Sequence, residues 1–238
     1  MIFYRRLSHI SAISFDLDDT LYANSPIMKC AEDKMQQYFH HNEKICCSTP
    51  LNQHFWQPFK AKAIEINPII AHDVVALRQK SYFLGFCSLG FSTAQAQTQA
   101  QQAMDYFSHV RSNFTLPEHT HQFLTELQQY FPLIAITNGN VDTKVIGINH
   151  YFKHIYHAVN GIKQKPNRDM FDHACQQLAI NNNQLLHVGD CGHADIQGAI
   201  NAGCQAAWIN SKGPGKALTV LPHIELTQLN DLLIFCKN

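Results

Sequence analysis

The chain has 238 residues and carries 18 basic and 18 acidic side chains, so its formal net charge is zero. This length allows one domain, or one domain that contains an inserted module. The apolar fraction of 45% is large enough for a packed core and excludes a chain that is disordered throughout. Because there is no basic excess, the composition argues against a general nucleic-acid-binding protein.

The eight cysteines form no Cys-x-x-Cys pair, which argues against a zinc knuckle or a thioredoxin-like redox site. The N-terminal segment lacks the long apolar stretch of a secretory signal peptide. No apolar run approaches the roughly 18 residues that indicate a membrane-spanning helix. We therefore expect a cytoplasmic protein with reduced thiols and no membrane partner.

The first predicted element is a buried strand at 10–15, a short run of β-branched and apolar residues. It leads directly into the acidic segment 16–20, which reads Asp-Leu-Asp-Asp-Thr. Open α/β sheets present reactive groups in this way, at the carboxyl ends of their strands. The segment thus predicts the first strand of such a sheet, followed by a functional loop.

Between about residues 24 and 113 the strand signals nearly disappear, and apolar residues recur at helical spacing. Ser92 and Thr93 are typical of a helix start, and the Ala- and Gln-rich segment 94–111 behind them consists of good helix formers. We predict an all-helical domain inserted at 23–112.

Strands and helices alternate in the rest of the chain. The predicted strands are 131–136, 154–159, 185–188 and 204–209, and the predicted helices are 118–130, 168–179, 194–202 and about 227–236. Alternation of this kind implies a parallel sheet with helices on both faces. The expected fold is α/β, with a Rossmann-like parallel sheet built from 1–22 and 113–238 and the helical insertion placed after its first strand.

Polar residues follow three of the predicted strands, and the carboxyl ends of parallel strands meet at one edge of a sheet. Lys165, which precedes Pro166 in the loop before a helix, is expected near the same edge. The residues at the strand ends are Asp16, Asp18, Thr137, Asn138, Gly189 and Asp190, followed by Asp195.

Carboxylates gathered so closely repel one another and need a cation to stay ionised. A ligand set made of oxygen alone suits Mg²⁺ better than zinc. A lysine, a threonine hydroxyl and free backbone amides around such an ion form a site for a phosphoryl group. Because a carboxylate is a competent nucleophile at phosphorus, the pattern indicates phosphoryl transfer through an aspartyl-phosphate.

Four motifs of this sequence resemble those of haloacid dehalogenase-like hydrolases, in the same order and at similar spacing. The resemblance implies a helical cap of the C1 type for the insertion at 23–112. The matching segments are the D-x-D-x-T run at 16–20, Thr137-Asn138-Gly139, Lys165-Pro166 and Gly189-Asp190 with Asp195.

Nearly the whole chain is similar to one bacterial subgroup of that family. Its members are flavin mononucleotide phosphatases that also dephosphorylate 5-amino-6-(5-phospho-D-ribitylamino)uracil, an intermediate of riboflavin biosynthesis. The segments that carry this similarity include FYRRLSHISAISFDLDDTLY at 3–22, AITNGN at 135–140 and HVGD at 187–190. The implied partner is a small-molecule phosphate ester, and the implied assembly is a monomer or homodimer.

The family resemblance also assigns roles to individual carboxylates. Asp16 is expected to be the nucleophile. Asp18 is expected to protonate the leaving alkoxide, then to activate the hydrolytic water, and to offer its backbone carbonyl to Mg²⁺. Asp190 is expected to complete the metal site, and Asp195 is either a ligand or a residue that orients one.

The remaining roles concern the phosphoryl group and the substrate. Thr137, the backbone amide of Asn138 and Gly139 are expected to hold the phosphoryl oxygens. Lys165 is expected to neutralise Asp16 and the phosphate. Arg78, in the insertion, is the cation that we expect to reach the substrate, the alternative being a solvated helix residue.

Some readings stay open. Lys163 could take the place of Lys165, although the Lys-Pro step favours Lys165. Asp195 could be an ordinary residue at a helix N-terminus. The segment 191–193 departs from the polar residues that are usual after this Gly-Asp pair, and His187 is interpreted as structural or solvent-exposed.

Four other functions compete with the riboflavin-pathway assignment. The chain could hydrolyse another small phosphate, such as a nucleotide, a sugar phosphate or phosphoglycolate. It could be a haloacid dehalogenase, although that chemistry needs neither Asp18 nor Asp190. It could be a non-catalytic regulator on the same fold, or a receiver domain, which would lack the insertion.

Overall fold

The computed structural model describes residues 1–42, 45, 50–159, 161–210 and 218–237. The chain divides into two compact units. The first, here called the core unit, comprises 1–23, 115–139 and 146–238. The second, here called the helical unit, comprises 24–114 and 140–145.

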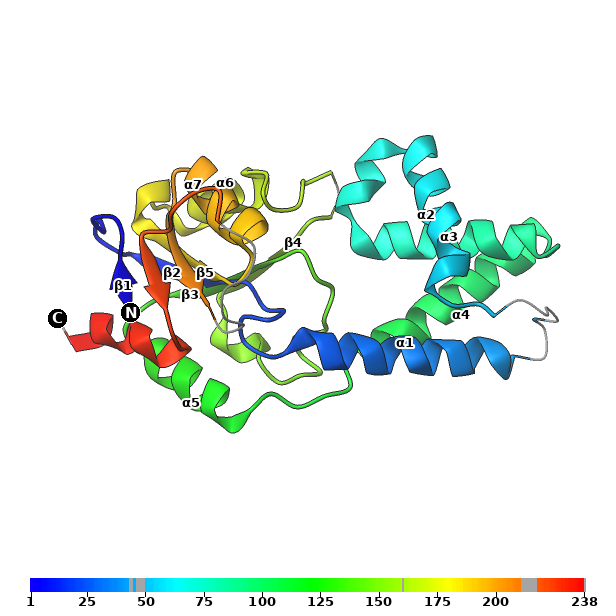
Figure 1. The fold of residues 1–238 in the computed structure, drawn as a ribbon, viewed down its shortest axis with the longest axis horizontal. Coiled ribbons are helices and arrows are strands. Elements are labelled where there is room, and N and C mark those ends of the chain that lie inside the picture. Colours follow the sequence, from blue (N-terminus) through cyan, green and yellow to red (C-terminus); the bar gives the residue numbers. More distant parts are fainter. Residues whose placement is uncertain (43–44, 46–49, 160, 211–217, 238) are drawn as a thin grey trace. The chain divides into compact units, whose positions relative to one another are not determined.

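The core unit is built on a seven-stranded sheet with the order β1-β7-β6-β5-β2-β3-β4. Figure 1 shows the strands of this unit together with its helices α5, α6 and α7. All neighbouring strands are parallel except β1 and β7, the antiparallel pair at one edge of the sheet. The strands are β1 (Ile2–Phe3), β2 (Ala12–Phe15), β3 (Leu133–Thr137), β4 (His154–His157), β5 (Leu185–Gly189), β6 (Gln205–Ile209) and β7 (Ile224–Leu226).

Every residue of the central strands β2, β3 and β5 is buried, as expected for parallel strands that are covered on both faces. Among the side chains packed in this core are Ile134, Phe171 and Ile196. The helical elements of the core unit are α5 (Glu118–Leu127), α6 (Asp169–Leu178), a π-helical turn (Gly192–Gln197), α7 (Gly198–Asn201) and a 3₁₀ helix (Leu229–Lys237), with short 3₁₀ turns at 149–151 and 182–184.

The helical unit contains α1 (Asn24–His40), α2 (Gln53–Ile66), a 3₁₀ turn (Pro68–His72), α3 (Val74–Ser88) and α4 (Thr93–Arg111). Its helix starts are set by side-chain caps. Asn52 and Asp73 accept backbone N–H groups of α2 and α3, and Ser92 and Gln95 form a reciprocal capping box at α4. Its separate apolar core is rich in aromatic rings, among them Phe39, Trp56, Tyr82 and Phe86.

The α/β class, the parallel arrangement of the main strands and the helical insertion between β2 and β3 confirm the sequence prediction. The strands β1 and β7 were not predicted, because two or three residues are too few to show a strand period. The last helix was predicted at about 227–236, and the structure has a 3₁₀ helix there. Within the described parts of the chain, none of the helices has the length and apolar character needed to span a membrane.

Candidate active site

The carboxyl ends of β2, β3 and β5 meet at one edge of the sheet because the three strands are parallel neighbours. Asp16 follows the last residue of β2, and its backbone amide donates to the carbonyl of Val188 in β5, at 2.9 Å. Thr137 ends β3, and Asp190 follows β5. The topology therefore brings together side chains that are far apart in the sequence.

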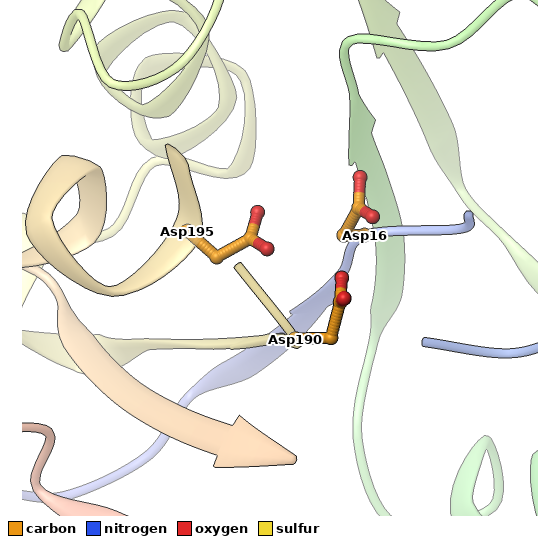
Figure 2. A group of neighbouring side chains, drawn as sticks. All are labelled: Asp16, Asp190 and Asp195. Atoms are coloured by element: carbon orange, nitrogen blue, oxygen red, sulfur yellow. The ribbon is translucent and has the colours of Figure 1, made fainter. Parts of the chain in front are cut away.

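Three carboxylates form the centre of this edge: Asp16, Asp190 and Asp195 (Figure 2). One oxygen of each lies within 4.8 Å of the others. Asp16 and Asp195 are buried, and Asp190 is partly exposed. Hard carboxylate oxygens at this separation fit a divalent cation, which would also offset their mutual repulsion. Asp18 was predicted to contribute a backbone oxygen and is not part of this carboxylate cluster.

Lys165 joins two of the carboxylates. Its Nζ lies 2.8 Å from Oδ1 of Asp16 and 2.7 Å from Oδ1 of Asp195, and it also donates to the carbonyl of Ile136. The lysine is only 2% exposed. Lys163, the alternative from the sequence, is exposed. The structure therefore places Lys165, and not Lys163, among the carboxylates.

Asn138 anchors the loop that carries this lysine. Its Nδ2 donates to the backbone carbonyl of Lys165, and its Oδ1 accepts the backbone N–H of the same residue, each at 2.9 Å. The side chain of Asn138 thus fixes the backbone around the cis Lys165–Pro166 bond. The predicted role of the Asn138 backbone amide at the phosphoryl group stays a prediction.

Asp18 lies against the loop that follows β3. Its Oδ1 accepts the hydroxyl of Tyr22 at 2.7 Å. A Cβ added at Gly139 would come within 2.5 Å of Asp18 Oδ2, so the backbone of Gly139 passes close to this carboxylate. The amide of Gly139 donates to Oγ1 of Thr137 at 3.0 Å. The structure thus brings Asp18, Thr137 and Gly139 together.

If Asp18 has the acid–base role that the sequence predicts, replacing Gly139 with alanine is expected to lower kcat/KM about a hundredfold, because displacing a catalytic group by about 1 Å can cost that much. The added methyl group would push the Asp18 carboxylate away. The backbone of Gly139 is outside the left-handed region, so alanine itself brings no strain. Steady-state kinetics together with thermal unfolding test this. An unchanged kcat/KM in the folded variant would contradict the placement of Asp18 in the active centre.

The electrostatics of the cluster are set by burial and by Lys165. Burial raises the pKa of Asp16 to about 7, despite the opposing attraction of Lys165. Burial alone would also raise the pKa of Asp195, but Lys165 and His187 outweigh it, and this pKa is lowered. The two carboxylates in turn raise the pKa of Lys165 against its desolvation. Lys165 and Asp195 are therefore a charged pair, beside a second carboxyl group that binds a proton readily unless a cation is present.

His187 belongs to this site, although sequence reasoning gave it no role there. It is fully buried in β5, and its Nε2 lies 3.2 Å from Oδ1 of Asp195. Burial, followed by the nearby Lys165, lowers its pKa to about 4. The sequence contained one signal, because His187 and Ser14 are polar residues within two strands that are otherwise apolar. Their pairing in the register of β2 and β5 is seen only in the structure.

The loop after β5 contains the π-helical turn. Asp195 and Ile196 both donate their backbone N–H groups to the carbonyl of Cys191, at 2.9 and 3.2 Å. The sequence predicted an ordinary helix at 194–202, and the structure has a π turn followed by the short α7. The wider turn brings the backbone N–H of Cys191 within 2.9 Å of Asp195 Oδ2.

Arg78 lies on α3 in the helical unit. Its guanidinium stacks 3.7 Å above the ring of Phe107, and Nη1 donates to the hydroxyl of Tyr82 at 3.5 Å. It lines a cavity of about 50 Å³ together with Glu32 and Lys60. Burial, followed by the positive charge of Arg78, lowers the pKa of Lys60. The lining of the cavity therefore includes two basic side chains and one acidic side chain.

Comparisons with known proteins agree on one family. A family model described as haloacid dehalogenase-like hydrolase matches residues 10–203. A curated relative, the 5-amino-6-(5-phospho-D-ribitylamino)uracil phosphatase YigB of Escherichia coli K12, is 35% identical over 236 residues, which cover 98% of both chains.

Two solved structures extend the comparison. A 2-haloacid dehalogenase from Pseudomonas syringae is similar with a TM-score of 0.88 and 28% identity, covering 95% of this chain and 98% of its own. YfnB from Bacillus subtilis, bound to magnesium, has a TM-score of 0.65 at 18% identity and covers 97% of this chain and 100% of its own. The likeness to YfnB concerns the fold alone.

Proposed function

Because the chain belongs to the haloacid dehalogenase-like hydrolase family and is a phosphomonoester hydrolase, we propose that it cleaves its substrates with Mg²⁺ through a phosphorylated Asp16. One observation carries this mechanism. Asp16 is buried within the carboxylate cluster, and Nζ of Lys165 lies 2.8 Å from its Oδ1, so Asp16 is held in place at the carboxyl ends of the strands.

The proposed reaction has two steps at phosphorus. In the first, an Asp16 oxygen forms a bond to phosphorus while the bond from phosphorus to the ester oxygen breaks, and Asp18 protonates the leaving alkoxide. In the second, Asp18 takes a proton from water, the water oxygen binds phosphorus, and the Asp16–phosphorus bond breaks. The products are an alcohol and inorganic phosphate, and both aspartates return to their starting states.

The metal is proposed to be held by the carboxylates of Asp16, Asp190 and Asp195 and the backbone carbonyl of Asp18. When bound, Mg²⁺ would neutralise charge on the carboxylates and on the phosphoryl oxygens. Ligands made only of oxygen, such as the three clustered carboxylates, favour Mg²⁺ over softer metals.

The phosphoryl oxygens are proposed to be bound by the Thr137 hydroxyl and by the backbone amide of Asn138. Gly139, whose own amide donates to Oγ1 of Thr137, is proposed to line this phosphate site. These groups lie at the end of β3, next to Asp18. Lys165 would supply positive charge to Asp16 as the phosphate approaches. Donors held rigidly before the reaction lower the barrier, because they need no reorganisation as charge develops.

The proposed substrates are flavin mononucleotide and 5-amino-6-(5-phospho-D-ribitylamino)uracil. Support for the second compound comes from YigB, a phosphatase of that compound whose similarity extends over nearly the whole of both chains. Both compounds are phosphate esters of a ribityl chain that carries a planar heterocycle. Another small phosphate, such as a nucleotide, a sugar phosphate or phosphoglycolate, is the alternative.

A substrate panel tests the proposal. Phosphate release is measured from both proposed substrates, a pyrimidine nucleotide, a sugar phosphate and phosphoglycolate, each with Mg²⁺ and again with EDTA. We expect release that requires Mg²⁺ and is fastest with the two ribityl phosphates. Faster release from another ester would contradict the substrate assignment alone. Halide release from a 2-haloacid in EDTA, without phosphate release, would contradict the reaction as well.

The helical unit is proposed to act as a cap that sets specificity, with Arg78 as its substrate-binding cation. Replacing Arg78 with glutamine is expected to raise KM about tenfold, the loss expected for about 1.5 kcal/mol of hydrogen bonding to a charged group. Lys80→Gln is the matched control, because residues two apart on a helix face different sides. Equal KM values for Arg78→Gln and wild type would contradict a substrate contact and favour the alternative that Arg78 is a solvated helix residue.

We further propose a cytoplasmic location and a monomeric or homodimeric state. The six cysteines within the described residues are free, which suits a reducing compartment.

A further inference from the structure

We propose that Ser14 and His187 act as a buried pair of positioning residues that fix Asp195 for the cation and for Lys165. This inference rests on the proposed function, since it concerns the same metal site. Neither residue touches the reacting atoms in the proposed mechanism. Both would act through the carboxylate of Asp195.

The pair is built into the centre of the sheet. Ser14 in β2 and His187 in β5 are register partners, and neither has any exposed surface. Oγ of Ser14 lies 2.8 Å from Nδ1 of His187. The ring of Phe171 packs edge-on against the imidazole, with centroids 5.0 Å apart. The imidazole is therefore held by a hydrogen bond on one side and an aromatic ring on another.

The chemistry of the partners assigns the protons. The Asp195 carboxylate can only accept, so Nε2 of His187 carries the hydrogen and donates it to Oδ1, at 3.2 Å. In a neutral imidazole Nδ1 is then an acceptor, and it accepts a hydrogen bond from the Ser14 hydroxyl. The chain of donors therefore runs in one direction, from Ser14 through His187 to Asp195.

Asp195 receives three donors from the protein. Lys165 Nζ and His187 Nε2 both donate to Oδ1, and the backbone N–H of Cys191 donates to Oδ2 at 2.9 Å. A carboxylate has about four acceptor positions. With three occupied, the group cannot turn about its Cβ–Cγ bond without losing hydrogen bonds in a buried site, and one acceptor position is left for a cation.

Close packing supports the same function. A Cβ added at Gly189 would lie 2.2 Å from Cγ of Asp195, so the backbone at the end of β5 passes directly against the carboxylate. His187 lies two residues earlier in the same strand. The strand thus fixes Asp195 by contact at one position and by a hydrogen bond at the other.

The test measures Mg²⁺ binding to the full chain by calorimetry, with phosphatase kinetics beside it. His187→Leu removes the donor, and we expect Kd for Mg²⁺ to rise about tenfold, the lower end of the effect of losing a partner of a metal ligand. His187→Gln keeps an N–H donor that can reach the Nε2 position and is expected to restore most of the affinity. Thermal unfolding of each variant reports folding separately.

Ser14→Ala provides a second variant, which is less disruptive than a change of the histidine. It is expected to weaken Mg²⁺ binding less than His187→Leu does. In the His187→Leu background, Ser14→Ala is expected to change Kd by less than about twofold, because Ser14 acts only through His187. If the two substitutions raised Kd for Mg²⁺ additively, the inference that Ser14 acts only through His187 would be overturned.

The failures of the two proposals are distinguishable. If the wild type binds Mg²⁺ and His187→Leu binds it equally well while melting at a lower temperature, His187 is structural only and the inference is overturned. If the wild type itself binds no Mg²⁺, the proposed metal site fails and the inference fails with it. If Mg²⁺ binding weakens in both leucine and glutamine variants alike, the N–H donor is not what matters, and the inference is overturned.

Discussion

Replacing Asp16 with asparagine is expected to abolish turnover and to leave the protein folded. In the proposed mechanism Asp16 supplies the oxygen that bonds to phosphorus, and an amide is a far weaker nucleophile than a carboxylate. Loss of a covalent nucleophile cannot be compensated by the remaining groups of the same unit. The residual rate is therefore expected to fall to the detection limit of a phosphate-release assay.

The same substitution is expected to leave the melting temperature at least as high as that of the wild type. The pKa of Asp16 is about 7 in the folded state, above the roughly 3.9 of an unfolded chain. The folded state therefore binds the proton more tightly, so the free energy of unfolding falls as pH rises between the two values and reaches its low plateau above 7. Asparagine does not ionise and avoids this loss.

The melting temperatures of wild type and Asp16→Asn are measured in EDTA across the pH range between the unfolded and folded pKa values of Asp16, roughly 3.9 to about 7. Kinetics are measured in Mg²⁺. Asp19→Asn is the matched control. Asp19 has a φ of 61°, a conformation that asparagine also tolerates, and it carries no role in the mechanism. A folded Asp16→Asn variant with wild-type turnover would overturn the mechanism, whereas Asp19→Asn is expected to keep its activity.

Replacing Lys165 with methionine is expected to destabilise the fold by about 3–5 kcal/mol, because it leaves two buried carboxylates without their cation. Lys165 contacts both Asp16 and Asp195 within 2.8 Å and is almost fully buried. Methionine has a similar length, so the loss of charge dominates over the loss of packing. Activity is expected to fall at least a hundredfold, as for the removal of one donor that stabilises the transition state.

Urea unfolding and steady-state kinetics check this expectation, with Lys163→Met as the matched control. Lys163 is exposed and two residues away, so its replacement is expected to change neither quantity measurably. The double variant Lys165→Met with Asp16→Asn is expected to regain part of the lost stability, because one of the two uncompensated carboxylates is gone. If Lys163→Met lost more activity than Lys165→Met, the assignment of the site lysine would be wrong.

The fold was accessible from the sequence because its main strands and helices are long enough to show their periods. Three features of the sequence indicated the observed elements. They are the apolar run of β2 with the Asp-rich loop after it, the capping residue Ser92, and the alternation of strands and helices after residue 118. The edge strands β1 and β7 have only two and three residues, too few to show a period. Their antiparallel pairing depends on contacts between the two ends of the chain. No local pattern could reveal it.

The site was accessible only in part. The order of the motifs and the rule for strand ends together predicted that Asp16, Asp190 and Lys165 would meet. His187 was missed because the sequence shows only the residues next to it in the chain. Its proposed role depends on Ser14 in the adjacent strand and on Asp195 in the turn after β5. Such a contact follows from the register of β2 and β5, which the sequence does not specify residue by residue.

The most direct test of the central claim is detection of the phosphoryl group on Asp16. The variant Asp18→Asn lacks the base for the second step, so a phosphorylated enzyme should accumulate with para-nitrophenyl phosphate, whose leaving group needs little protonation. The reaction is quenched rapidly in acid and the peptides are analysed by mass spectrometry. We predict one added phosphoryl group on the peptide that contains Asp16, at the Asp16 position, with Mg²⁺ and not with EDTA. Phosphate release without a phosphoryl group on Asp16, or with one at another residue, would contradict the mechanism.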